Sequence, residues 1–274
     1  GMIPYTLKGS FDLHITDYCN LHCKGCVVLD YNQSGEVTNE KYTLDNVIDV
    51  ISNLKKFNLK LEELKILGGE PTLHTDLNQI IDYIKSTNTV EKLTLVTNGL
   101  NFTQEVVEIL TKLDRIIISI YPMSKSIESV FSNSELGDML SSKVHIDYLY
   151  QEYFFLYGYK QDGLEYNTEL NWKRCLQKDD CRVINLDGLY RCTITYSEKK
   201  NICEWNNRQE IIDFIESDIP LSHCKDCPMP AKTTKWETNN SPIDLKNSMR
   251  GLNLIRTWSH KISKKELDSY EKYS

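Results

Sequence analysis

The sequence predicts an α/β fold: a parallel sheet covered by helices, followed by a small cysteine-rich domain. Over the first 150 residues, apolar strand patterns alternate with helical patterns, and repeated strand–helix units form parallel sheets. Beyond about residue 160 cysteines recur, and Asp187-Gly188 signals a β-hairpin. We therefore expect a core over residues 2–160, a cysteine-rich hairpin and helix domain over 161–238, and a polar tail with a short helix over 239–274.

The strands of the core are predicted from short apolar runs of the kind buried in parallel sheets. They are expected at residues 11–16, 64–67, 92–97, 115–120 and 144–149, with a sixth at 153–159. Helices capped by Thr43 and Thr103, one over residues 77–84 and a weaker one at 124–131 lie between them. In the second domain we expect hairpin strands at 182–186 and 189–194, then a helix with Ile211, Ile212 and Ile215 on its buried face.

Three closely spaced cysteines follow the first strand. Cys19, Cys23 and Cys26 have the spacing C-x₃-C-x₂-C. Thiolates this close can bind one face of an iron–sulfur cluster, since cubane clusters take ligands from short loops. With only three thiolates, a fourth metal position stays open for a ligand, as in catalytic metal sites. A structural zinc site would instead need a fourth protein ligand, such as His22, His14 or a distant cysteine.

This cysteine loop resembles the signature of radical S-adenosylmethionine (radical SAM) enzymes, and a second motif carries the same resemblance. The second strand ends in Gly68-Gly69-Glu70-Pro71, where two glycines let the backbone pass close to a ligand. The resemblance implies a partial (β/α)6 barrel with its ligands at the carboxyl ends of the strands. It implies a 4Fe–4S cluster on the three cysteines. It also places the amino group of S-adenosylmethionine beside Gly68, Gly69, Glu70 and Pro71.

Other strand ends extend the resemblance. Asn98 belongs to a Thr-Asn-Gly sequence like that of relatives, although a turn role for Asn98-Gly99 is equally good. Ser119 ends the fourth strand, where relatives contact the ribose; they often have Ser-x-Asp there, whereas this chain has Ser-Ile-Tyr. Gly25 stands where relatives often have an aromatic residue near the adenine. Backbone or an apolar side chain such as Val27 would then cover the adenine.

The later cysteines resemble the auxiliary-cluster region, called twitch or SPASM, that follows many radical SAM cores. The resemblance implies one auxiliary 4Fe–4S cluster, and the best four ligands are Cys175, Cys192, Cys224 and Cys227. Cys181 could replace Cys175, and Cys203 is left over. A zinc site or free buried thiols are the alternatives. His14, in the first strand, is read as a core histidine or one that supports the site.

Composition narrows the class of protein. The net charge of −7 argues against nucleic acid as a main partner, because phosphate binding relies on Lys and Arg. No run of about 18 apolar residues predicts a membrane span. The first residues show no export signal, and clustered cysteines in such a chain are more often metal-binding or catalytic. We therefore expect a cytoplasmic protein.

The resemblance implies reductive cleavage of S-adenosylmethionine, giving a 5′-deoxyadenosyl radical that abstracts hydrogen from a substrate. An electron donor such as flavodoxin or ferredoxin is implied as a partner. No recognisable peptide-recruiting extension precedes the first strand, so we expect a small-molecule or sugar-type substrate, with net oxidation through the auxiliary cluster. The alternatives are a peptide- or protein-modifying enzyme and an activase. Two further alternatives are not enzymes: a non-catalytic Fe–S electron carrier and a zinc-stabilised binding module.

Overall fold

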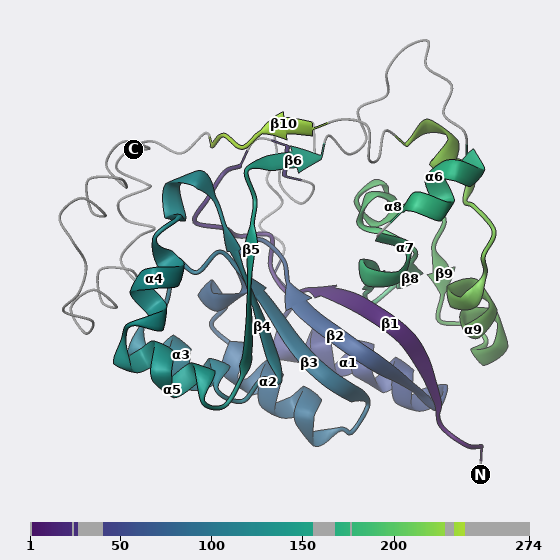
Figure 1. The fold of residues 1–274 in the computed structure, drawn as a ribbon. Coiled ribbons are helices and arrows are strands. Elements are labelled where there is room, and N and C mark those ends of the chain that lie inside the picture. The colour runs from purple at the N-terminus through teal and green to yellow at the C-terminus, as the bar shows by residue number, and fades with distance from the viewer. Residues whose placement is uncertain are drawn as a thin grey trace.

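The computed structural model describes residues 2–23, 25–26, 41–155, 168–175, 177–227 and 233–238. Within these residues the centre of the molecule is an eight-stranded sheet (Figure 1). In order across the sheet its strands are β5 (His145–Tyr150), β4 (Arg115–Ile120), β3 (Val90–Thr97), β2 (Leu59–Leu67), β1 (Tyr5–His14), β7 (Arg182–Ile184), β8 (Gly188–Tyr190) and β9 (Cys203–Glu204). Pairing is parallel from β5 to β7 and antiparallel from β7 to β9. The predicted partial barrel of parallel strands is confirmed.

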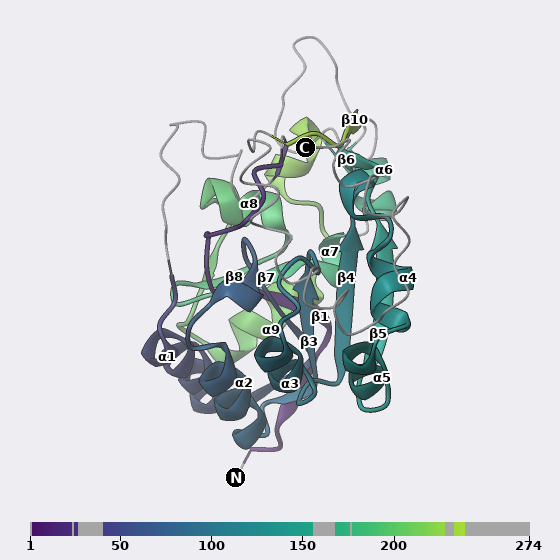
Figure 2. The same ribbon diagram turned by 90° about the vertical axis from the view of Figure 1, so that its left-hand side faces the viewer.

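Helices connect the parallel strands and pack on one face of the sheet (Figures 1 and 2). They are α1 (Leu44–Lys56), α2 (Leu77–Ser86), α3 (Gln104–Leu110), α4 (Ile127–Ser132) and α5 (Glu135–Ser141). The predicted caps of α1 and α3 are confirmed. The hydroxyl of Thr43 accepts from the backbone N–H of Asn46 at 3.2 Å, and that of Thr103 from Val106 at 3.1 Å. The apolar stripes predicted for α1 and α2 are buried in the core.

Two predictions of elements need correction. The weak helix expected at 124–131 forms as α4, preceded by the 3₁₀ helix η2 (Pro122–Ser124). α5 was not predicted; Ser134 starts it by accepting from the N–H of Gly137 at 2.9 Å. The expected sixth strand forms as β6 (Tyr153–Phe155). It pairs antiparallel with β10 (Thr233–Lys235) in a separate sheet, and residues 156–159 lie outside the described part. The sixth parallel strand is instead β7, beside β1.

The cysteine-rich region is joined directly to the sheet. The predicted hairpin is β7–β8, and β7 pairs with β1 at Phe11 and Asp12. The other elements are α6 (Thr168–Arg174), α7 (Gln177–Asp180), α8 (Thr193–Glu198), α9 (Arg208–Glu216) and the 3₁₀ helix η3 (Ser222–Asp226). The prediction that the second hairpin strand reaches Ile194 is wrong. Cys192 caps α8, its sulfur accepting from the N–H of Thr195 at 3.4 Å, so the chain turns into a helix there.

The inner face of the sheet carries polar side chains. Ser10 and Asp12 lie on the same face of β1, because side chains alternate along a strand. The carboxylate of Glu63 on β2 accepts hydrogen bonds from the hydroxyls of Ser10 and Thr94, and lies 3.3 Å from the guanidinium of Arg115. These contacts form a polar layer near the middle of β1, β2 and β3.

The predicted division near residue 160 and the tail from residue 239 fall outside the described residues, so both remain predictions. In the part of the chain that the structure covers, no helix has the length and apolar character needed to cross a membrane.

Candidate active site

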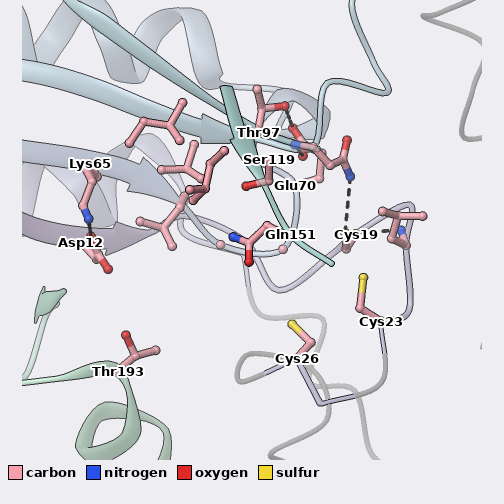
Figure 3. Close-up of a pocket in the computed structure, with 18 of the residues that line it drawn as sticks. Asp12, Cys19, Cys23, Cys26, Lys65, Glu70, Thr97, Ser119, Gln151 and Thr193 are labelled. Carbon is pink, nitrogen blue, oxygen red and sulfur yellow. Dashed lines mark hydrogen bonds and ion pairs between the residues drawn. The ribbon is translucent and has the colours of Figure 1, made fainter. Parts of the chain in front are cut away.

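A cavity of about 340 Å³ lies where the carboxyl ends of the parallel strands meet the cysteine loop and the cysteine-rich region. Figure 3 shows the cysteine sulfurs on one side of it and strand residues on the other. Most of the predicted site residues line this cavity: Cys19, Cys23, Cys26, Gly68, Gly69, Glu70, Asn98 and Ser119. Pro71 lies just outside, where it begins the 3₁₀ helix η1 (Pro71–Leu73) and is buried.

The cysteine loop holds its three thiols toward the same cavity. The sulfur of Cys19 accepts a hydrogen bond from the N–H of Leu21 at 3.3 Å. The N–H of Cys26 donates to the carbonyl of Cys23 at 3.2 Å, which closes a tight turn. Burial raises the pKa of the Cys19 thiol, and the negative charges of Glu70 and the other two cysteines raise it further. Sulfur ligands with N–H donors beside them are the donor set that an iron–sulfur cluster takes, so the residues present fit that group.

The Gly-Gly-Glu-Pro turn is bound to the cysteine loop through the backbone. The N–H of Gly69 donates to the carbonyl of Thr16 at 2.7 Å, and that of Glu70 donates to Tyr18 at 2.8 Å. A Cβ on Gly68 would lie 2.1 Å from the Thr16 oxygen, and one on Gly69 would lie 2.1 Å from the Tyr18 oxygen. Both glycines are therefore required by the close approach of the cysteine loop itself.

Glu70 joins the ends of β2 and β3. Its buried carboxylate accepts from the hydroxyls of Thr72 and Thr97, each at 2.6 Å, and from the N–H of Asn98 at 2.8 Å. Burial raises the pKa of Glu70, and these hydrogen bonds oppose that rise. The amide of Asn98 donates to the side chain of Asn20 at 2.7 Å and accepts from the N–H of Leu100 at 3.0 Å. Asn98 thus supports both its own turn and the cysteine loop.

The later cysteines divide into groups. Cys175, Cys192, Cys224 and Cys227, the predicted auxiliary set, line one small cavity of about 40 Å³. Cys181 instead lines the large cavity. Cys203 lies on β9, where its sulfur approaches the carbonyl of Glu204. The structure therefore brings the predicted four together and places the other two elsewhere.

Polar contacts hold the turn that carries the last two cysteines of this set. The amide of Asn171 donates to the carbonyls of Cys224 at 3.4 Å and Cys227 at 3.2 Å. Among the described residues, no three His, Cys, Asp or Glu side chains are arranged to hold a single metal ion. Thiolates around a four-iron cluster bind different irons, so they stand further apart than the ligands of one ion. The four-thiol set fits a cluster by its donor chemistry.

Several residues that face the large cavity were missed from sequence. Asp12 and Lys65 are cross-strand partners on β1 and β2, with 3.3 Å between Oδ1 and Nζ. Gln177 and Thr193, the first residues of α7 and α8, line the same cavity. The available signal was a charged residue inside each of two apolar strand runs, Phe-Asp-Leu and Leu-Lys-Ile.

His14 belongs to the core beside this site. It is 5% exposed and stacks on Tyr196 with 4.8 Å between ring centroids. Within the described residues neither ring nitrogen has a hydrogen-bond partner. Burial lowers the pKa of His14 to about 4, with the positive charge of Lys65 as the second cause.

Comparison with known proteins identifies a family model and relatives that this chain resembles. Residues 13–126 match the family model described as the Radical SAM superfamily. GTP 3′,8-cyclase of Haemophilus ducreyi is 32% identical over 95 residues, which is 34% of this chain and 27% of that protein. The chain thus spans about a quarter of the length of this curated relative.

Two solved structures are also similar. The crystal structure of BtrN in complex with AdoMet and 2-DOIA has 16% sequence identity and a TM-score of 0.52, and the match covers 78% of this chain and 84% of that one. The crystal structure of Streptococcus suis SuiB bound to precursor peptide SuiA has 14% identity and a TM-score of 0.46, over 81% of this chain and 70% of that one. The likeness to BtrN shows the fold.

Proposed function

The chain belongs to the radical SAM superfamily, and from this premise we propose that it acts on a small-molecule or sugar-type substrate with net oxidation. When bound, a 4Fe–4S cluster supplies one electron to S-adenosylmethionine, whose 5′-deoxyadenosyl radical takes a hydrogen atom from the substrate. The electron comes from a one-electron donor such as flavodoxin or ferredoxin. The observation that carries this proposal is the shared cavity of the cysteine loop and the Gly-Gly-Glu-Pro turn.

Cys19, Cys23 and Cys26 would hold the cluster. Their support is the common cavity that they line and the rigid attachment of their loop to Gly69 and Glu70. The N–H of Leu21 at the Cys19 sulfur would help to set the reduction potential, because hydrogen bonds to sulfur are one of its determinants.

Gly68, Gly69 and Glu70 would bind the methionyl end of S-adenosylmethionine. Glu70 is a buried acceptor at the cavity wall, suited to a positively charged amino group. Pro71 would fix the turn from behind, since its ring restricts the backbone. Asn98 would position the cysteine loop, and the buried hydroxyl of Ser119 faces the cavity where it could bind the ribose. Val27, considered for the adenine, lies outside the described residues.

Cys175, Cys192, Cys224 and Cys227 would hold an auxiliary 4Fe–4S cluster that accepts an electron from the substrate radical. The support is their common cavity and its closeness to the large one, because Gln177 lines both. Arg191 also lines the small cavity, with its guanidinium 4.9 Å from the ring centre of Trp172. Its positive charge beside thiolates would favour the electron-accepting role.

Anaerobic reconstitution tests the proposal. The protein is loaded with iron and sulfide, reduced and given S-adenosylmethionine, and 5′-deoxyadenosine is measured by chromatography. We expect product from the parent and from Cys203→Ala, and none from Cys23→Ala, since Cys203 lines neither cavity. A parent that forms no product and is isolated with stoichiometric zinc would show a zinc-stabilised module. A cluster that cycles electrons without cleaving S-adenosylmethionine would show an electron carrier.

A further inference from the structure

The side of the large cavity away from the cysteine loop holds a buried polar group to which the proposed chemistry assigns no role. Asp12 on β1 and Lys65 on β2 form an ion pair there. Gln177 and Thr193 approach the same space from the cysteine-rich region. In Figure 3 the labelled Asp12, Lys65 and Thr193 lie across the cavity from the three cysteines.

Two of these side chains can accept further hydrogen bonds. Asp12 is 4% exposed and Gln177 is 8% exposed. Within the described residues, Oε1 of Gln177 accepts no hydrogen bond. Oδ1 of Asp12 faces the ammonium of Lys65 at 3.3 Å, and a carboxylate has acceptor sites beyond that one contact. Buried acceptors in folded proteins are normally satisfied, so the free Oε1 of Gln177 beside this pair indicates the position of a ligand.

Lys65 adds a donor to these acceptors. Its ammonium group donates to the carbonyl of Asp180 at 2.6 Å and faces Asp12, and an ammonium has three protons. The site therefore offers two acceptors and one further proton around a pair with no net charge. A charged ligand group would be attracted by one member of this pair and repelled by the other, so it would gain little net electrostatic energy there. Hydroxyl groups both donate and accept, so they match this set without adding charge.

We propose that Asp12, Lys65 and Gln177 bind the hydroxyl groups of an uncharged polyhydroxylated substrate, such as a sugar or cyclic polyol. This inference rests on the proposed function. It concerns the substrate and not the cofactor, because the residues assigned to S-adenosylmethionine lie at the ends of β2 to β4. Asp12 and Lys65 lie two residues before the ends of β1 and β2. Gln177 also lines the auxiliary cavity, so a carbon held here lies between the two cysteine sets.

The test measures the rate of 5′-deoxyadenosine formation by the reconstituted enzyme with increasing amounts of a defined mixture of hexoses and inositols. A second sample of the mixture is cleaved by periodate, which destroys vicinal diols, and freed of reagent. The variants are Gln177→Leu and the charge-free pair Asp12→Asn with Lys65→Met. Gln209→Leu, on the exposed side of α9, is the matched control.

We expect the intact mixture to raise the rate of the parent and of Gln209→Leu, and the periodate-treated mixture to have no effect. In both cavity variants the half-saturating concentration should rise about 5- to 30-fold, the factor that corresponds to losing one or two hydrogen bonds. Iron content, compared with the parent, separates this effect from loss of the clusters. If the charge-free pair does not fold, Gln177→Leu still decides, because it buries no charge.

No stimulation of the parent, stimulation that survives periodate, or unchanged half-saturation in Gln177→Leu would each overturn the proposal. Stimulation by a set of cysteine-containing peptides in place of the polyols would overturn it in favour of a peptide substrate. A parent that forms no 5′-deoxyadenosine under any condition is a different result, because it refutes the proposed function itself.

Discussion

A single hydrogen atom at Gly69 decides how closely the two motifs of the site approach. A Cβ there would lie 2.1 Å from the carbonyl oxygen of Tyr18, and both partners are backbone. We predict that Gly69→Ala separates the cysteine loop from the turn. The unfolding free energy should fall by about 1–3 kcal/mol, the usual cost of forced overpacking, and iron content after reconstitution should drop.

Gly99→Ala is the matched control for this substitution. Gly99 has φ +73°, and an added Cβ would meet the side chain of Ile118 at 3.0 Å, which can shift. It should cost about 1–2 kcal/mol through backbone strain and leave the iron content at the parent level. Equal iron loss in both variants would mean that strain in general, and not the contact with Tyr18, controls cluster binding.

His14 should make stability depend on pH. Its pKa is about 4 in the folded protein and about 6.5 when unfolded. A lowered histidine pKa means that protonation favours unfolding, so the stability present above pH 6.5 is lost as the pH falls from 6.5 toward 4. Between pH 7.5 and pH 5 the parent should lose about 2 kcal/mol more than His14→Phe, whose ring can still stack on Tyr196.

Urea unfolding at the two pH values measures this difference. Acid loss of bound metal affects both proteins alike, so the difference between their slopes belongs to His14. Identical slopes would show that the ring is already protonated or solvated in the folded state.

At the scale of elements, the pairing of β1 with β7 attaches the cysteine-rich region to the barrel. Arg182 on β7 is buried, donates to the carbonyl of Lys8 at 2.6 Å, and lies 4.7 Å from the ring centre of Phe11. We predict that Arg182→Met loosens this junction. Backbone amides of α7 and α8 should exchange with deuterium faster, and those of α1 and α2 should not change.

Hydrogen exchange with mass spectrometry checks this prediction, and Arg174→Met, an exposed position on α6, is the control. Uniformly faster exchange over the whole chain would show that Arg182 stabilises the molecule globally and not one junction.

Local patterns explain which elements could be predicted. Buried apolar runs located β3 and β4 almost to the residue, and threonine caps located the starts of α1 and α3. The first halves of β1 and β2 were missed because polar residues and glycine interrupt the apolar pattern: Lys8 and Gly9 in β1, and Lys60, Glu62 and Glu63 in β2. The antiparallel pairing of β6 with β10 depends on segments about 80 residues apart, which no local pattern specifies.

The residues of the site also divide into those that a local pattern predicts and those that depend on contacts between distant segments. The spacing of Cys19, Cys23 and Cys26 is local, so sequence alone located them, and the structure groups them as expected. Asp12 and Lys65 could not be paired from sequence, because their contact depends on the register of β1 against β2. A charged residue inside an apolar strand indicates a polar group on the inner face of the sheet, but it does not identify the partner of that group.

At the scale of the whole molecule, the two sets of cysteines should give two clusters. Each 4Fe–4S cluster contains four irons, so the reconstituted parent should hold about eight irons per chain. Replacing Cys175, Cys192, Cys224 and Cys227 together by Ala should leave about four, since these line only the small cavity. Cys181→Ala should keep about eight, because Cys181 lines the large cavity and not the small one.

Colorimetric iron and sulfide assays, with zinc measured on the same samples, check this count. About four irons in the parent with one zinc would show that the second set is a structural zinc site. About four irons in Cys181→Ala would show that Cys181 is a ligand in place of Cys175. In the first case the route for net oxidation would have to be reconsidered, because the electron from the substrate would no longer have the acceptor that the shared wall at Gln177 places next to it.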